Sequence, residues 1–167
     1  KRSRKELTEM FIKIGRILTF LLIFIWSVFL LYGKDFIILW VGSDYEDSYL
    51  ISLVIMTAYI LPLVQNFANS LIEATGVFKF KAKVYFFSIS TGIVIGALLS
   101  PYYGYWAITY SYSFFWIISQ IIMNWYFEKR LNLDMIYFFK QTFGKIFFVL
   151  IFSLGIGYFI NIYFIQT

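Results

Sequence analysis

The sequence predicts an all-α integral membrane protein with about five transmembrane helices. Its composition is the first reason: 61% of the 167 residues are hydrophobic and only 14% are charged, whereas soluble domains are about 45–50% apolar and about 25% charged. Second, long uncharged runs alternate with short charged segments, as membrane crossings alternate with loops. Third, 13 of the 14 Lys and Arg residues fall in three of those segments. These features exclude a soluble globular domain, a disordered tail and a nucleic-acid-binding module, so no nucleic-acid partner is expected.

The sequence contains no Cys and no His. It can therefore supply no disulfide, no Cys nucleophile, no His general base, and no zinc or haem site built on those ligands. Chemistry based on carboxylates or on Ser and Lys stays open in principle. We expect a protein that is not an enzyme, with no catalytic residues, no metal and no cofactor.

The five spans are expected near residues 14–33, 49–72, 84–100, 106–127 and 146–165. The first follows a basic segment, as a signal peptide does. Its apolar run is long, contains Trp26 and Phe29, and ends without a small-residue cleavage site, so we interpret it as a retained helix. In the second span, Pro62 predicts a kink. The third and fourth divide an uncharged run of 44 residues at Pro101 and Gly104, which predict a turn.

The segment 35–42, between the first two spans, is too short to cross a bilayer. It follows Gly33, where we expect the first helix to break, and it precedes an acidic loop. The expected structure is an amphipathic turn at the outer membrane surface, with Trp40 as its anchor.

The basic segments predict the orientation of the chain. Six Lys or Arg residues precede the first uncharged run, three lie within 73–83 and four within 128–145. In a five-span path all three segments lie on one side, which the positive-inside rule places in the cytoplasm together with the N-terminus. The C-terminus is then external. Because the chain begins without Met and has an odd number of spans, we expect a piece of a larger protein.

Uncharged polar residues fall on faces of two spans. Gln65 and Asn69 lie four residues apart in the second span, as do Gln120 and Asn124 in the fourth. A polar stripe that faces lipid is unfavourable, so both stripes must face protein or a wet cavity. Two interpretations stay open, namely hydrogen bonds between helices and the lining of a substrate path. No Asp, Glu, Lys or Arg lies in the middle of a span, which disfavours an ion-coupling site.

Small residues recur at every fourth position of the third span: Ser88, Gly92, Gly96 and Ser100. Such a stripe lets two helix backbones approach closely, so it predicts helix packing and not a binding site. Ser153, Gly157 and Asn161 repeat the pattern more weakly in the fifth span.

A longer pattern surrounds the first external junction and comprises Gly33, Phe36, Leu39, Trp40, Gly42 and Tyr45. A polar helix, a short basic loop, a small-residue helix and a second helix follow, with a charged segment before the last span. This arrangement resembles the polysaccharide biosynthesis (O-antigen and capsule) flippases of the multidrug/oligosaccharidyl-lipid/polysaccharide exporter superfamily.

The resemblance implies a fold, a location and a function. The chain would belong to the second lobe of a two-lobe transporter of about 12–14 helices in a bacterial or archaeal cytoplasmic membrane. It would flip a polyprenyl-pyrophosphate-linked oligosaccharide to the outer leaflet by alternating access. Its partners would be the bilayer, this substrate and the remaining lobe, which would supply the cations for the pyrophosphate. The four amide residues named above would line the sugar path.

Three alternatives stay open. A multidrug or cation exporter of the same superfamily would need an intramembrane carboxylate. A membrane-embedded glycan transferase or polymerase would have Asp44, Glu46 and Asp47 of the external loop as its only candidate acids. A non-catalytic membrane subunit would pack against a partner through the small-residue stripe.

Overall fold

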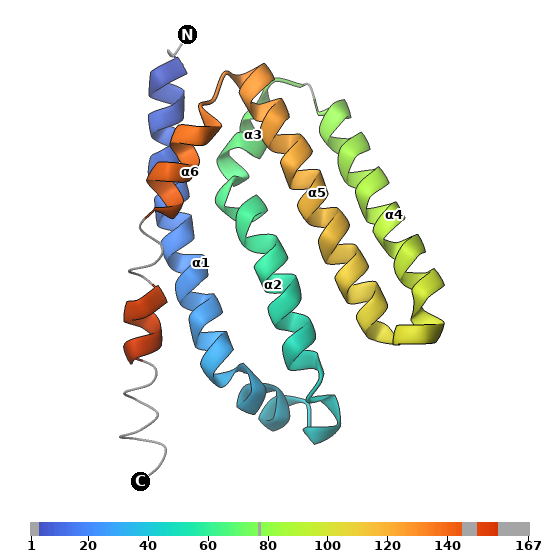
Figure 1. Cartoon of the computed structure of the whole chain (residues 1–167). Coiled ribbons are helices and arrows are strands. Elements are labelled where there is room, and N and C mark those ends of the chain that lie inside the picture. Colours follow the sequence, from blue (N-terminus) through green and yellow to red (C-terminus); the bar gives the residue numbers. More distant parts are fainter. Residues whose placement is uncertain (1–3, 77, 145–149, 157–167) are drawn as a thin grey trace.

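The computed structural model describes residues 4–76, 78–144 and 150–156, and all regular secondary structure in these ranges is helical (Figure 1). In chain order the elements are α1 (Arg4–Trp40), the short 3-10 helix η1 (Ser43–Tyr45), α2 (Ser48–Val64), α3 (Asn66–Ala74), α4 (Lys79–Tyr103), α5 (Tyr105–Leu131) and α6 (Met135–Phe143). Residues 150–156 form a further helical stretch. The prediction of an all-α chain is confirmed for these ranges.

Two helices are long and apolar enough to cross a bilayer, α1 over Lys5–Trp40 and α4 over its whole length. The bent pair α2–α3 forms a third candidate if its two helices make one span. α5 covers the fourth expected span, but its Tyr, Ser, Gln and Asn residues lower its hydropathy, and it does not qualify. The fifth expected span lies outside the described residues except for 150–156. Two or three candidate spans are therefore present, and five crossings stay a prediction.

The first helix does not break at Gly33, and residues 35–42 do not form a separate turn, so both expectations are wrong. α1 continues through Gly33 to Trp40, and the helical path ends at Gly42, whose φ of +113° is a conformation that favours glycine. A single glycine inside a helix costs only about 1 kcal/mol, and the apolar run that follows continues the helix. The last turns of α1 swing toward the start of α2 (Figure 1).

The second expected span is bent near Pro62, as predicted, but the bend lies after the proline. α2 and α3 meet at Gln65 with an angle of 52°. Pro62 lacks an N–H, and its ring clashes with the carbonyl of Ala58 in a straight helix. The break falls at Gln65, three residues after the proline. There the Gln65 carbonyl accepts hydrogen bonds from the N–H groups of Ala68 and Asn69, at 3.0 and 3.2 Å, and α3 starts.

α4 and α5 form a close helical hairpin. Its turn is Gly104 alone, with φ +59°, whereas Pro101 lies inside the last turn of α4. Gly92 and Gly96 are buried where α4 meets α5. A Cβ atom would lie 3.1 Å from the α5 backbone at Gly92 and 2.7 Å from the Cα of Ile108 at Gly96. The small-residue stripe of α4 therefore lies against α5.

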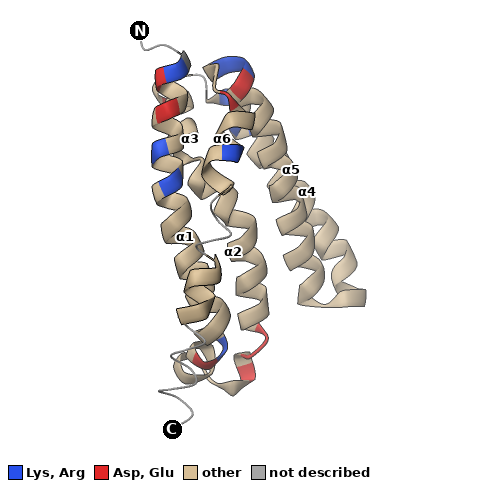
Figure 2. Ribbon diagram, turned by 60° about the vertical axis from the view of Figure 1, so that its left-hand side comes forward, with Lys and Arg blue, Asp and Glu red and all other residues tan. Residues whose placement is uncertain are grey.

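Most of the buried apolar side chains, 11 of the 16 among the described residues, gather at one end of the bundle. Their single cluster comprises Phe11, Ile12, Val64, Ala68, Ile72, Met123, Tyr126, Phe127, Leu133, Met135 and Phe138. Lys and Arg residues gather at the same end (Figure 2). We call it the basic end. At the other end, Lys34 is the one basic residue among those described, beside the acids of residues 35–47. We call this the acidic end.

α6 lies on the first turns of α1 at the basic end. The N–H of Asp134, the residue before α6, donates to the hydroxyl of Thr8 at 3.3 Å. Near the end of α6, the carbonyl of Gln141 accepts a hydrogen bond from Nε of Arg16 at 3.0 Å. Because both helices advance in the same direction between these contacts, α6 runs parallel to α1.

Candidate functional site

The amides predicted in the second span lie at the break between α2 and α3. Gln65 is fully buried, and neither its side-chain nitrogen nor its oxygen has a hydrogen-bond partner among the described residues. Asn69, one turn later, is also buried, and its Oδ1 accepts a hydrogen bond from the hydroxyl of Tyr85 on α4 at 3.4 Å. Asn69 therefore links helices, whereas Gln65 bonds to no neighbouring helix.

The amides predicted in the fourth span belong to a longer row on α5. We call this row, Ser113, Trp116, Gln120 and Asn124, the α5 polar stripe. The first three residues are buried. In the part of the chain that the structure describes, the Ser113 hydroxyl, the Trp116 N–H and the carbonyl oxygens of Gln120 and Asn124 have no partner. The Gln120 side-chain nitrogen donates to neighbouring Ser119 at 3.3 Å. No hydrogen bond joins the stripe to Gln65.

Three tyrosines pack around Trp116 of the stripe. The ring of Trp116 lies 4.9 Å from that of Tyr59 on α2, 5.1 Å from that of Tyr85 on α4 and 6.2 Å from that of Tyr112 on α5, measured between centroids. The hydroxyls of Tyr59 and Tyr112 hydrogen-bond to each other. We call these four residues the aromatic cluster. Its ring contacts link α2, α4 and α5 beside the stripe, whose first three residues are buried.

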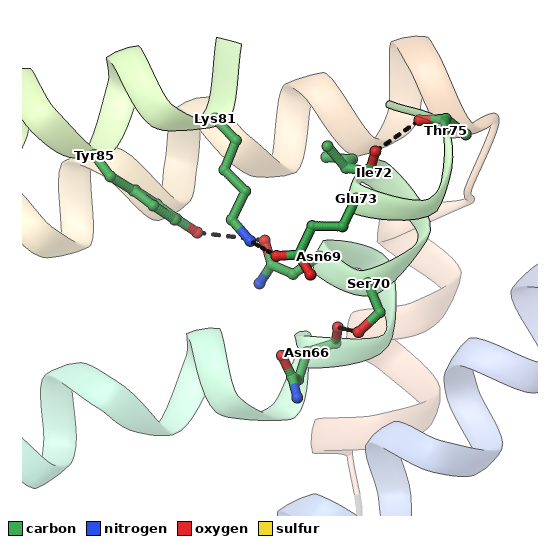
Figure 3. A network of polar contacts seen from close by, with 8 residues as sticks. All are labelled: Asn66, Asn69, Ser70, Ile72, Glu73, Thr75, Lys81 and Tyr85. Atoms are coloured by element: carbon green, nitrogen blue, oxygen red, sulfur yellow. Dashed lines mark hydrogen bonds and ion pairs between the residues drawn. The ribbon is translucent and has the colours of Figure 1, made fainter. Parts of the chain in front are cut away.

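An ion pair lies beside the aromatic cluster, toward the basic end. Nζ of Lys81 lies 2.6 Å from a carboxylate oxygen of Glu73 and 5.8 Å from the centre of the Tyr85 ring. Figure 3 shows these residues and Asn69 in one network. The Lys81 side chain is only 17% exposed, so it points inward from α4. Because Glu73 balances its charge, this lysine joins α3 to α4 and is not a free anion site.

A second polar contact joins α2 to α5 at the acidic end. The Asp47 carboxylate, just before α2, accepts a hydrogen bond from the hydroxyl of Tyr105, the first residue of α5. This hydrogen bond raises the pKa of Tyr105 above its ordinary value of 10.0, because it requires the protonated hydroxyl. Nearby, Lys34 and Glu46 form an exposed ion pair of 2.7 Å.

The residues that carry the family resemblance lie apart from the buried amides. Gly33, Phe36, Leu39 and Trp40 belong to the last turns of α1, and Gly42 and Tyr45 follow it. The rings of Phe36 and Trp40 contact each other at 5.5 Å, and both side chains are more than half exposed. This segment therefore has a surface position at the acidic end.

The buried polar groups suit a neutral ligand. They are amides, a hydroxyl and an indole N–H, which donate and accept hydrogen bonds but carry no charge. Within the described ranges, no group of three or more acids could hold a metal ion. The three candidate acids of a transferase lie at the acidic end, where Glu46 and Asp47 already bind Lys34 and Tyr105.

The sequence analysis missed the tyrosines of the aromatic cluster. A signal was present, since Tyr59 and Tyr112 lie inside uncharged runs, whereas aromatic anchors lie at the ends of spans. Comparison of the chain with protein-family models, curated proteins and solved structures finds no match in any of the three. The function is therefore inferred from the site itself and from the resemblance described above.

Proposed function

We propose that the chain is part of a transporter that flips a lipid-linked oligosaccharide across a membrane by alternating access. The observation that carries the proposal is the set of buried, unpartnered polar groups at Gln65 and along the α5 polar stripe. Each such group costs about 1–3 kcal/mol. Inside a bilayer no lipid chain can satisfy it. We infer that a polar ligand or water meets these groups when the site opens.

The chemistry of these groups favours a sugar over an ion. Sugar hydroxyls both donate and accept hydrogen bonds, as the side chains of Gln65, Gln120 and Asn124 do. A cation exporter would need a carboxylate at membrane depth, and Glu73 instead lies at the basic end of α3, paired with Lys81. The substrate's pyrophosphate would need Lys or Arg. We place those cations in the remaining lobe.

The bent pair α2–α3 supplies a means of opening. Discontinuous helices form the binding sites of many transporters. The α4–α5 hairpin is packed backbone to backbone, so it moves as one unit. Four polar contacts between described residues join it to α2–α3 and the residue before α2: Tyr59–Tyr112, Tyr85–Asn69, Lys81–Glu73 and Asp47–Tyr105. Separating these contacts would expose the α5 polar stripe to the substrate.

The distribution of charge supports a cytoplasmic location for the basic end. Lys and Arg residues of α1, α4, α5 and α6 gather there (Figure 2). With the positive-inside rule, this end and the N-terminus face the cytoplasm, and α2–α3 and α5 both cross the bilayer. The membrane would be the cytoplasmic membrane of a bacterium or archaeon, as the resemblance implies.

A non-catalytic membrane subunit is the second candidate, favoured by the exposed helix surfaces. In the most apolar 18-residue stretch of each helix, only 11% of α4 and 22% of α1 is buried within the bundle. The exposed apolar faces could pack against a partner protein as well as against lipid. A partner subunit without its own transport activity would have the same surfaces.

A flipping assay separates the two candidates. The full-length protein is reconstituted in vesicles with a fluorescent polyprenyl-pyrophosphate oligosaccharide, and an external lectin reports the sugar that reaches the outside. We expect Gln120→Leu to slow flipping about tenfold, the effect of losing about 1.4 kcal/mol. Ile121→Leu, at the adjacent and 63% exposed position, is the matched control and should retain the rate. Flipping no faster than in protein-free vesicles would reject the transporter and favour the subunit.

A further inference from the structure

A groove of about 470 Å³ lies between α2 and α5, in the half of the bundle away from the buried core. Its apolar lining comes from Leu53, Val54 and Ala58 of α2 and from Tyr110, Phe114 and Ile117 of α5. None of these residues belongs to the core cluster at the basic end. The groove is therefore a separate feature of the bundle, open along its side.

The groove extends over about two-thirds of the thickness of one leaflet of a bilayer. From Tyr110 to Ile117 it follows α5 for roughly 10 Å, at 1.5 Å per residue. The hydrocarbon of one leaflet is about 15 Å thick, half of the roughly 30 Å core. An apolar groove of this length at this depth fits a hydrocarbon chain.

The end of the groove that is nearer the acidic end of the bundle lies beside negatively charged residues. The Asp47–Tyr105 contact lies above it, six residues before Leu53 and five before Tyr110. Asp44 and Glu46 lie in the same connection, and Asp35 lies in the last turns of α1 beside Lys34, the one described cation at this end. Four carboxylates against one ammonium give a negative potential, which attracts a cationic group and repels an anionic one.

Ser113 gives independent evidence that the groove holds more than hydrocarbon. This residue lines the groove and is 5% exposed, and its hydroxyl has no partner among the residues described. It lies eight residues, or about 12 Å, below Tyr105 along α5. The headgroup layer is about 5–8 Å deep on each side of the core, so Ser113 lies just beneath it. The ester carbonyls of a phospholipid lie at the inner boundary of that layer and are the lipid acceptors nearest to Ser113.

We propose that this groove binds one phospholipid whose headgroup ends in an ammonium group, of the phosphatidylethanolamine class. One acyl chain lies between α2 and α5, an ester carbonyl accepts the hydrogen bond of Ser113, and the ammonium lies among the acids near Asp47. The inference requires α2 and α5 to lie in a bilayer but does not depend on transport, so it and the proposed function fail separately.

Photo-crosslinking tests the proposal with the full-length protein in vesicles of phosphatidylethanolamine and phosphatidylglycerol. A trace of either lipid carries a diazirine on one acyl chain, and labelled peptides are mapped by mass spectrometry. We expect the phosphatidylethanolamine probe to label residues 53–58 and 110–117 about tenfold more than the phosphatidylglycerol probe. Asp47→Asn should lower this labelling about two- to fivefold, the effect of losing one exposed ion pair. Ser113→Ala should lower it about tenfold, as one buried hydrogen bond is lost.

The groove can also be filled. Ala58→Phe places a ring in it and should abolish labelling, whereas Ile93→Phe, on an exposed site of α4 away from the groove, should leave labelling unchanged. Competition of the wild-type signal by unlabelled phosphatidylethanolamine, but not by phosphatidylglycerol, gives the same test without a variant. Equal labelling by both probes, labelling spread evenly over α4, or a protein segment crosslinked in the groove in place of lipid would overturn the proposal.

Discussion

The hydroxyls of Ser27 in α1 and Ser153 in the C-terminal helical stretch lie 2.9 Å apart and are buried together. The two residues are 126 positions apart, as are Thr8 and Asp134, which meet near the start of α1. The sequence separation of the contacting residues is thus the same at two positions more than five turns apart on α1. The end of the described chain therefore runs alongside α1 in the same direction. If α1 enters the membrane from the basic end, the C-terminal stretch enters from that end too.

Two Gly→Ala substitutions should have opposite effects on the free energy of unfolding, one at the α4–α5 interface and one outside it. Gly96→Ala places a Cβ 2.7 Å from the Cα of Ile108, so α4 and α5 must separate, at a cost of about 1–3 kcal/mol in the free energy of unfolding. Gly155→Ala, in the C-terminal stretch, places its Cβ within 4 Å of no described residue and should stabilise its helix by about 0.5–1 kcal/mol. Unfolding in mixed micelles measures both. Equal effects would mean that α4 and α5 are not in backbone contact.

Docking of α6 on α1 depends on the absence of a side chain at residue 15. A Cβ on Gly15 would lie 2.6 Å from the ring of Phe138, which itself stacks on Phe11 with 3.8 Å between centroids. Gly15→Ala should therefore destabilise the wild-type protein but should be neutral or stabilising when Phe138→Ala is also present. We expect a coupling of about 0.5–3 kcal/mol in the double-mutant cycle. If the effects of the two substitutions are additive, Phe138 does not contact Gly15, and α6 does not pack on α1 at this position.

The hydrogen bond between Asn69 and Tyr85 should contribute a small but measurable coupling. We expect about 0.6 kcal/mol for Asn69→Leu and Tyr85→Phe in a double-mutant cycle, as for other polar pairs between membrane helices. Tyr45→Phe, at an exposed site outside the bundle, is the control for loss of a tyrosine hydroxyl. A coupling of zero would show that α3 and α4 are not joined through this pair.

The contact at the acidic end should make stability fall at high pH. The pKa of Tyr105 is raised because its hydroxyl donates to Asp47, so the folded state favours the protonated form. The contribution of this hydrogen bond to the free energy of unfolding is then complete below pH 10. It is lost as the pH rises through the pKa of Tyr105 in the folded protein. Thermal unfolding from pH 8 to 11 should show a steeper loss for wild type than for Tyr105→Phe. Identical profiles would indicate that the contact is absent in solution.

Much of the helical pattern was predictable because charges and turn residues mark it directly. The break at Gly104 follows from backbone chemistry that a single residue dictates, and a bend near Pro62 was predictable, although it falls three residues later at Gln65. The continuation of α1 through Gly33 was not predictable, because a glycine interrupts a helix only when its neighbours do not favour one. The helix boundaries thus depended on the neighbouring residues, which the spacing of the apolar residues does not describe.

The candidate site was predictable only in part. Spacing alone placed Trp116, Gln120 and Asn124 on one face of a helix, and the structure extends that face to Ser113. The contacts of Trp116 with Tyr59 and Tyr85 join three helices, and no local pattern encodes which helices meet. The inward turn of Lys81 depends in the same way on Glu73, which approaches it only in the folded chain.

Solvent accessibility of the α5 polar stripe tests the central claim most directly. The chain contains no Cys, so a single introduced cysteine reports one position without background. In vesicles supplied with a lipid-linked oligosaccharide, we expect Gln120→Cys to react with a membrane-impermeant thiol reagent. Ile121→Cys, whose side chain is directed outward, should stay unreactive. If Gln120→Cys is as unreactive as Ile121→Cys from both sides of the membrane, the stripe is dry helix packing, and the proposed substrate path is contradicted.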